Sequence, residues 1–444
     1  MRYHPFVLLI VLCGLVLVSC NSSRNPLFGN KSLVNKYAQK IEDAGLKNTK
    51  MGREWFAASA LSLNKPDSLA LPLSETGFFT AATPAARGFL FSVKRGEKIM
   101  ANISLKPAGA YTVFTELWKW SPNDRTLLES TDSAKKQIEY IVKKDGLFML
   151  RLLPELLSDI EYTVTVTTGP SLAFPVSASG KPRIISVWGV DRDGGARRHE
   201  GIDIQAPERT PALAATDGII SRVGDNRLGG KVVFLSDPLT GNSLYYAHLD
   251  SQIAVRGQRV RTGDVIGLVG KTGNAINTVP HLHFGIYAVG GAINPLPFIN
   301  KEIREPAAVN YPASRLQQWI TTKAAGNVYE RPAASAPVVQ QVLTGTPVRA
   351  IAAQPGWLRI TLPEGEHGFI QEKFISTKAG KKVWLATGTK LLSMPDSSAA
   401  GRAMLSQKME VNMIGRYQDF YLVQMNDTYG WLQQDVYEKA KNIL

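Results

Sequence analysis

Cysteine and histidine are scarce in this sequence, which has two cysteines and six histidines in 444 residues. Long hydrophobic runs are also rare, and the apolar run at residues 6–18 has only 13 residues. A membrane-spanning helix needs about 20 apolar residues. The run is therefore too short for a span, and its position after a positively charged start predicts a secretory signal.

The end of this signal determines how the cysteines can be used. The letters LVSC at residues 17–20 resemble the lipobox of bacterial lipoproteins. The resemblance implies that residues 1–19 are removed and that Cys20 carries lipid. Cys13 then leaves with the signal, so the mature chain could form no internal disulfide. Asn21 is not the aspartate that retains lipoproteins in the inner membrane, so we expect an outer-membrane anchor facing the periplasm. The alternative is an ordinary signal in which Cys20 is incidental.

Composition favours a β-rich chain with several domains. A length of 444 residues suggests roughly three domains or more. The 38 glycines and 25 prolines indicate many turns. A net charge of +14 favours an anionic environment, such as nucleic acid, a membrane surface or cell wall, although a soluble basic surface is also consistent with it.

The N-terminal third changes from helical to strand periodicity. Ser32 can cap a helix over residues 32–46, and a second helical stretch ends near Pro66. Alternating apolar residues and turns such as Asp145-Gly146 then predict paired strands. We predict a tether and helical segment at residues 20–66 and a β-sandwich at 67–169, in which we find no catalytic constellation.

The C-terminal part contains an internal repeat with a spacing of about 63 residues. GWLRITLPEGEHGFIQEKFI is echoed by DFYLVQMNDTYGWLQQDVY, which aligns Trp357 with Phe420. Each unit is strand-rich and similar to bacterial SH3-like wall-binding domains. We predict two small SH3-like β-barrels, at residues 313–378 and 379–444. Their aromatic residues can belong to the cores or to ligand sites.

Two histidines stand two positions apart in the stretch PHLHFGIY at residues 280–287. Positions i and i+2 share a face in a strand but not in a helix, so the stretch predicts a strand. His281 and His283 would lie on one face, with Leu282 and Phe284 supplying the core on the other. This geometry suits a metal or acid–base site, although paired histidines in sheets are often plain hydrogen-bonding residues.

Further histidines stand in two other strand-like patterns. RHEGIDI places His199, Gly201 and Asp203 on one face of a predicted strand, with the glycine leaving space for an ion. LYYAHL similarly aligns His248 with Leu244 and Tyr246. Two histidines and one carboxylate suit Zn²⁺, because catalytic zinc has three protein ligands and one open position. The other two histidines would then be free to move protons.

These motifs together resemble a known family. HEGID, YAHL and GLVGKTGNAINTVPHLHFGIY, followed by INPLPFI, look like the motifs of the lysostaphin/LytM-like zinc endopeptidases of peptidoglycan. The resemblance implies an antiparallel-sheet peptidase domain at residues 170–300, with zinc bound by His199, Asp203 and His283. It also implies that His281 is the general base for the attacking water, and that His248 stabilises the oxyanion or assists proton transfer.

Two alternatives accompany this interpretation. The Gly-Asp and Gly-Gly turns of the block also occur in lipoyl-like carrier domains, but a carrier would not need four histidines in register. A catalytically silent wall-binding scaffold, or an activator of other wall hydrolases, could use the same fold. Because degenerate relatives usually lack ligands and all five positions are present here, an active enzyme is favoured.

The expected whole is a mainly β, multidomain zinc metalloendopeptidase with peptidoglycan as its partner and a membrane anchor at Cys20. We expect no nucleic-acid binding, and the sequence does not indicate which proteins are its partners. The resemblance implies cleavage of either polyglycine bridges or direct cross-links, and we expect the direct cross-link from D-alanine to meso-diaminopimelate. Arg192, Arg197, Arg198 and Lys271 could pair with the free carboxylates of such stems at the cleft rim, or be solvated surface charges.

Overall fold

The computed structural model describes residues 32–434, except for 133, 136, 377–379, 386 and 427. The predicted mainly β fold is confirmed, since this part of the chain has 33 strands and three α-helices. The predicted signal and Cys20 lie outside the described residues. None of the helices in the described part is long and apolar enough to cross a membrane.

Two capped helices come first, α1 (Leu33–Asp43) and α2 (Lys50–Asn64). The side chains of Ser32 and Thr49 each accept a hydrogen bond of 3.1 Å from a backbone amide three residues later. Such caps satisfy amides that have no partner within the helix. The helices pack through Trp55, which is only 1% exposed, against the domain that follows.

That domain is a β-sandwich. One sheet has the order β1-β3-β8-β5-β6, and the other contains β2, β9, β4 and β7. The inward side chains of both sheets form one core, to which Phe89, Ile99, Phe148 and Val164 contribute. The strands are β1 (Asp67–Ser68), β2 (Leu73–Phe79), β3 (Arg87–Val93), β4 (Glu97–Lys106), β5 (Val113–Trp120), β6 (Arg125–Thr131), β7 (Gln137–Ile141), β8 (Gly146–Pro154) and β9 (Ile160–Pro170).

Residues 171–300 form a second domain, which we call the histidine domain. Its main sheet has the order β10-β13-β20-β17-β16-β15-β18. One apolar core lies beneath it, and the helix α3 (Leu296–Ile299) closes the domain. The strands are β10 (Arg183–Ser186), β11 (Asp191–Arg192), β12 (Arg197–Arg198), β13 (Ile202–Gln205), β14 (Pro211–Leu213), β15 (Gly218–Asn226), β16 (Gly230–Ser236), β17 (Ser243–Gln252), β18 (Arg259–Val260), β19 (Val265–Val269), β20 (His281–Ala288) and β21 (Gly291–Ile293).

The remaining strands form two SH3-like modules. Trp357 and Phe420 begin corresponding strands of the two, β26 and β32, so the internal repeat is a repeat of structure. The first module contains β22 (Trp319–Thr321), β23 (Gly326–Tyr329), β24 (Val338–Val342), β25 (Pro347–Gln354), β26 (Trp357–Thr361) and β27 (His367–Gln371). The second contains β28 (Lys381–Trp384), β29 (Thr389–Leu392), β30 (Gly401–Leu405), β31 (Glu410–Tyr417), β32 (Phe420–Met425) and β33 (Thr428–Gln433).

The first module and the sandwich share one sheet. β2 pairs with β25 through Thr76–Ala353 and Gly77–Ala352, so ten strands, β22 included, form one sheet that runs from the module into the sandwich. Phe369 of the module is buried in the core of the sandwich. The two ranges, predicted as separate domains, are therefore joined by both backbone pairing and packing.

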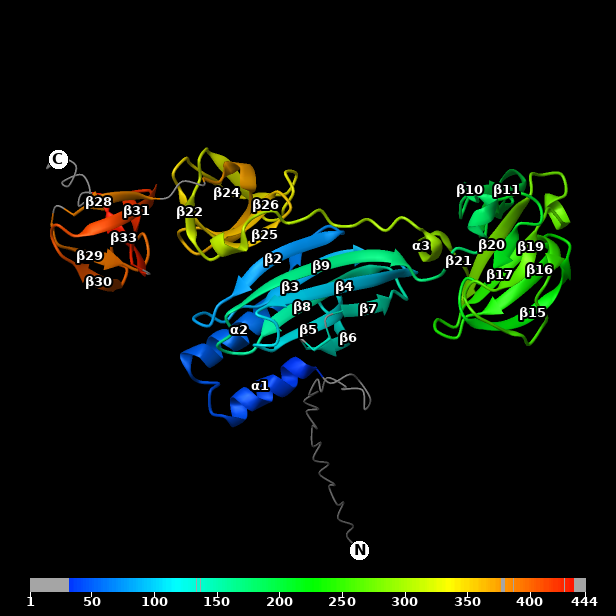
Figure 1. Cartoon of the computed structure of the whole chain (residues 1–444), viewed down its shortest axis with the longest axis horizontal. Coiled ribbons are helices and arrows are strands. Elements are labelled where there is room, and N and C mark those ends of the chain that lie inside the picture. Colours follow the sequence, from blue (N-terminus) through cyan, green and yellow to red (C-terminus); the bar gives the residue numbers. More distant parts are fainter. Residues whose placement is uncertain are drawn as a thin grey trace, which may run out of the picture.

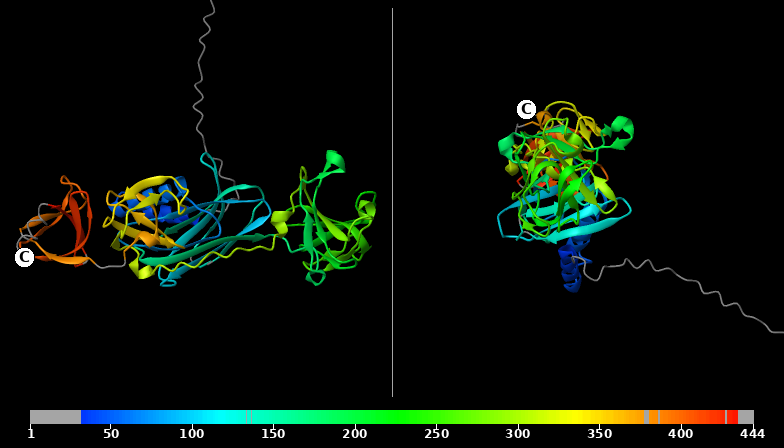
Figure 2. Two further views of the ribbon diagram at one scale, coloured as in Figure 1. Left: turned by 90° about the horizontal axis from the view of Figure 1, so that it is seen from above. Right: turned by 90° about the vertical axis from the view of Figure 1, so that its right-hand side faces the viewer.

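The histidine domain lies at the opposite end of the molecule from the second module (Figures 1 and 2). Its last helix contacts the sandwich, because a Cβ at Gly96 would come within 2.2 Å of the Phe298 ring. Residues 301–312 then run back along the sandwich to the first module (Figure 1). Both ends of the histidine domain are thus attached to the unit formed by the sandwich and the first module.

Candidate metal centre

The site lies where neighbouring strands of the histidine domain run side by side. β13 pairs with β20 so that Asp203 stands opposite His283, and β17 lies on the other side of β20. The strand predicted for the paired histidines is confirmed as β20. Leu282 and Phe284 are fully buried in the core, which leaves His281 and His283 on the face of the site.

His199 lies outside the strand in which we expected it. β13 begins at Ile202, and His199 precedes it in a segment held by two backbone hydrogen bonds of 2.9 Å, to Gly189 and Val190. The prediction that one strand presents both His199 and Asp203 is therefore wrong, because pairing with β20 starts only at residue 202. The two side chains nevertheless meet.

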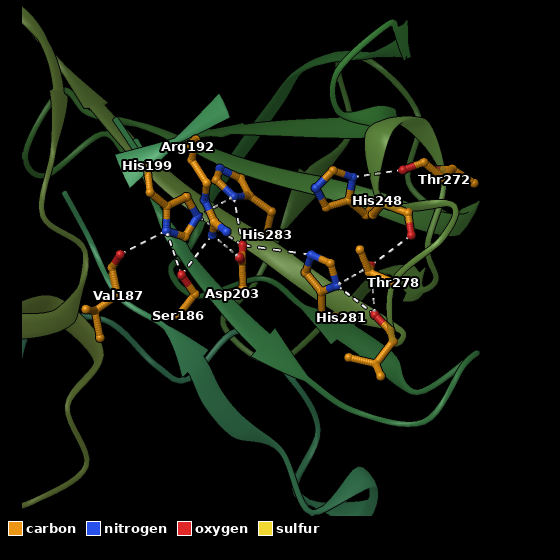
Figure 3. Close-up of polar contacts among 12 residues, drawn as sticks. Ser186, Val187, Arg192, His199, Asp203, His248, Thr272, Thr278, His281 and His283 are labelled. Atoms are coloured by element: carbon orange, nitrogen blue, oxygen red, sulfur yellow. Dashed lines mark hydrogen bonds and ion pairs between the residues drawn. The ribbon is translucent and has the colours of Figure 1, made fainter. Parts of the chain in front are cut away.

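Three side-chain atoms converge at the site (Figure 3). His199 Nε2 lies 3.0 Å from Asp203 Oδ1 and 3.1 Å from His283 Nδ1, and the last two atoms are 3.0 Å apart. Two ligands bound tetrahedrally to zinc at about 2.0–2.1 Å lie about 3.3 Å from each other. The triangle is close to the size that a zinc ion requires, and its two nitrogens and one oxygen are donors that zinc accepts.

Neighbouring groups fix the orientation of His199. Its Nδ1 donates to the carbonyl of Val187 at 2.9 Å, and Ser186 Oγ lies 3.3 Å from the same nitrogen. Because a carbonyl oxygen can only accept, Nδ1 carries the proton and Nε2 presents its lone pair to the site. This is the tautomer that a metal ligand needs.

The carboxylate of Asp203 has two different environments. Oδ1 faces the two histidines, whereas Oδ2 accepts a hydrogen bond of 2.6 Å from Arg192 Nη2. Burial raises the pKa of Asp203, but the imidazoles of His199 and His283 beside Oδ1 outweigh it and hold the pKa well below its usual range. The group is therefore ionised at neutral pH and can serve as a metal ligand.

Gly201 makes room for a ligand side chain. A Cβ at this position would lie 2.7 Å from two atoms of the His283 imidazole and 2.7 Å from the carbonyl oxygen of Phe284. We expected the glycine to leave space for an ion. In the structure the space is filled by His283 itself, so any larger residue would displace that ring.

His248 reaches the cleft because β17 departs from regular alternation. We expected His248 to share a face with Leu244 and Tyr246, but those two residues are fully buried in the core. The prediction of a shared face is wrong. The register between β16 and β17 shifts near this point, and His248 has a φ of 62°. This bulge turns the imidazole out of the core and towards the site.

His248 and His281 stand side by side with their ring centroids 5.0 Å apart. Nδ1 of His248 donates to the carbonyl of Thr272, and Nδ1 of His281 donates to that of Val279, each at 2.8 Å. Both rings therefore keep a lone pair at Nε2 when neutral. His281 Nε2 lies 3.9 Å from Asp203 Oδ1. Burial lowers the pKa of His248 to about 4, so this ring is neutral near pH 7.

These groups line an open cleft of about 730 Å³. Within the part of the chain that the structure describes, the lining residues all lie between Ile185 and Tyr287. The sandwich and the SH3-like modules therefore contribute no wall to the described cleft.

Of the basic residues expected at the rim, Arg192, Arg197 and Arg198 line the cleft, whereas Lys271 is not among its lining residues. Arg192 forms a hydrogen bond with Asp203, so its guanidinium is already engaged within the site.

The cleft has an aromatic wall, of which Phe234 and Tyr245 were not predicted from the sequence. Phe234, Tyr245 and Tyr287 line it, and the Tyr245 ring packs edge-on against His283 with centroids 5.8 Å apart. Strand periodicity places Tyr287 on the same face of β20 as His281 and His283, and Tyr245 similarly alternates with the buried Leu244 and Tyr246 in β17. The carbonyls of Val187 and Thr272 carry no such signal, because every residue has a carbonyl.

Comparison with known families identifies two parts of the chain. Residues 197–295 match the model of peptidase family M23, and residues 324–376 match that of the bacterial SH3 domain. The chain therefore contains a peptidase family M23 domain and a bacterial SH3 domain, as the motifs predicted.

Individual relatives match the same region. The chain is 40% identical over 100 residues to the DD-carboxypeptidase/endopeptidase Mpg of Neisseria gonorrhoeae, covering 22% of each protein. It is 34% identical over 139 residues to the L-Ala–D-Glu endopeptidase of Bacillus subtilis, covering 29% of this chain and 42% of that protein. The match thus spans less than half of the length of either relative. Among solved structures, the catalytic domain of lysostaphin from Staphylococcus simulans is 28% identical, with 28% of this chain and 97% of that chain covered and a TM-score of 0.25.

Proposed function

We propose that the chain is a zinc-dependent endopeptidase that hydrolyses peptide cross-links of bacterial peptidoglycan. The observation that supports this most strongly is the convergence of His199, Asp203 and His283 in an open cleft, beside two further histidines with fixed tautomers. A zinc ion held by the three ligands would polarise a peptide carbonyl and lower the pKa of water to about 7.

His281 fits the part of general base. Its Nδ1 proton is engaged by a backbone carbonyl, so the free Nε2 lone pair can accept a proton from a water molecule beside Asp203. The backbone contact also prevents the ring from turning its protonated nitrogen towards the site.

His248 fits proton transfer better than direct binding of an oxyanion. In its neutral form Nε2 has no hydrogen to donate, because the ring proton is on Nδ1 and bound to Thr272. Nε2 becomes a donor only after it has accepted a proton. Of the two roles that the family resemblance implied for His248, the geometry therefore supports assistance in proton transfer.

The bond that we propose is the direct cross-link from D-alanine to meso-diaminopimelate. In support, relatives of the histidine domain include a DD-carboxypeptidase/endopeptidase. Another relative is an L-Ala–D-Glu endopeptidase, so that bond is the main competitor. Arg198 is exposed at the cleft and could pair with a stem carboxylate.

The remaining parts would bring the enzyme to its substrate. We propose that Cys20 anchors the chain in the outer membrane on its periplasmic side and that the SH3-like modules bind the wall. The similarity of residues 324–376 to the bacterial SH3 domain supports the second part of this proposal. The lipobox-like letters before Cys20 support the first.

Metal analysis of the purified protein tests the zinc site. We expect one zinc per chain by mass spectrometry of the intact protein and by elemental analysis. Asp203→Ala should lose the metal and the hydrolysis of cross-linked wall fragments together, since a two-histidine site binds zinc far more weakly. Full zinc occupancy in Asp203→Ala would remove this residue from the site.

A further inference from the structure

A two-stranded ribbon brings an arginine to the candidate metal centre. β11 pairs with β12 apart from the main sheet, and Arg192 lies in β11. His199 follows β12 directly, and its main chain is bonded to Gly189 and Val190, just before the ribbon. One short segment therefore fixes the position of Arg192 relative to His199.

Arg192 binds the oxygen of Asp203 that faces away from the histidines. Its Nη2 lies 2.6 Å from Asp203 Oδ2, whereas Oδ1 is the atom that lies 3.0 Å from both His199 and His283. Oδ1 of the carboxylate therefore faces the two histidines, and Oδ2 is bound by the arginine (Figure 3).

We propose that Arg192 is a positioning residue that holds Asp203 so that only Oδ1 is presented to the metal. This inference rests on the proposed zinc site. An aspartate has a broad torsion about its last side-chain bond, so a free carboxylate could exchange its oxygens or turn away. A charge-assisted hydrogen bond to Oδ2 opposes both movements.

The same nitrogen of Arg192 also reaches Ser186. Nη2 lies 2.8 Å from Ser186 Oγ, and that hydroxyl lies 3.3 Å from His199 Nδ1. Arg192 is therefore connected to the surroundings of two proposed ligands, Asp203 and His199. Groups of this kind behind metal ligands commonly contribute about 10- to 100-fold to metal affinity.

A competing role for Arg192 is recognition of a substrate carboxylate. The side chain is 33% exposed and lines the cleft, so a substrate could reach it. The two roles affect different quantities. A positioning residue changes zinc affinity in the absence of substrate, whereas a substrate-binding residue changes KM and leaves zinc affinity intact.

Zinc titration of the full chain against a chromophoric chelator distinguishes these roles. We expect Arg192→Gln to weaken zinc binding by about 10- to 100-fold. Arg192→Lys keeps the charge and should recover part of that loss. Arg256→Gln is the matched control, because Arg256 is an exposed arginine of the same domain and is not among the residues that line the cleft. Circular dichroism of each metal-free variant confirms that it is folded.

The outcomes separate this inference from the proposed function. If the unchanged chain binds no zinc, the proposed function fails and the inference fails with it. If the unchanged chain binds zinc and folded Arg192→Gln binds it within twofold as tightly, the positioning role is wrong. An increase in KM in that variant would then assign Arg192 to the substrate.

Discussion

Replacing Glu75 with glutamine should loosen the joint between the sandwich and the first SH3-like module. Glu75 is fully buried and accepts hydrogen bonds from Arg87 at 2.9–3.0 Å, from Tyr162 at 2.8 Å and from Gln354 at 2.8 Å. Gln354 ends β25, so the last of these bonds crosses from the module into the sandwich. The glutamine keeps the shape of the side chain but removes its charge.

The expected cost follows from what remains around Arg87. Removing one partner of a buried ion pair destabilises a protein by about 3–5 kcal/mol, because the other charge is left buried without a partner. Asp67 still lies 2.6 Å from Arg87 in the variant, so we take the lower end, about 3 kcal/mol. This corresponds to about a hundredfold change in the equilibrium for local opening.

Native-state hydrogen exchange measures this local equilibrium directly. Amides of β2 and β25 should exchange about a hundredfold faster in Glu75→Gln, whereas those of β20 in the histidine domain should not change. Glu139→Gln is the control, because Glu139 forms an exposed pair with Lys98 at 3.0 Å, and such pairs contribute about 0–1 kcal/mol. Equal exchange rates in Glu75→Gln and Glu139→Gln would refute the assignment of the buried network to the joint.

Three further predictions concern the site, the modules and the anchor. His281→Ala should keep its zinc and hydrolyse wall fragments about two to four orders of magnitude more slowly, whereas His283→Ala should lose the metal; equal zinc loss in both would contradict the assigned roles. Deleting residues 380–444 should reduce binding to intact sacculi and leave cleavage of a small soluble peptide nearly unchanged, whereas deleting 313–444 should also destabilise the sandwich, as thermal unfolding would show. Cys20→Ser should move the chain to the soluble fraction, and continued sedimentation with salt-washed membranes would count against lipid anchoring.

Strand periodicity was sufficient to predict the face that carries His281 and His283. Alternation in β20 is regular, so the buried positions of Leu282 and Phe284 could be inferred from the letters alone. The same argument failed for His248, because a bulge and a positive φ reverse the face at that residue. Bulges depend on the partner strand, so one strand's sequence does not reveal them.

Contacts between distant segments were also beyond the sequence patterns. The pairing of β2 with β25 joins residues more than 250 positions apart, and neither strand carries a signal that names its partner. In the sequence, Glu75 and Gln354 are ordinary polar residues of two predicted domains, and nothing indicates that their side chains meet. From the sequence, Arg192 could pair with a substrate carboxylate or be a solvated surface charge. Its contact with Asp203 could not be inferred, because that contact depends on the path of the β11–β12 ribbon.

Cleavage of purified, cross-linked peptidoglycan dimers by the zinc-loaded chain tests the central claim most directly. Dimers joined from D-alanine to meso-diaminopimelate should yield monomers, a chelator should stop the reaction, and added zinc should restore it. Parallel substrates with an intact L-Ala–D-Glu bond or a pentaglycine bridge identify the bond that is cut. If the folded, zinc-loaded protein leaves all three substrates intact, the account of this chain as a wall endopeptidase is contradicted.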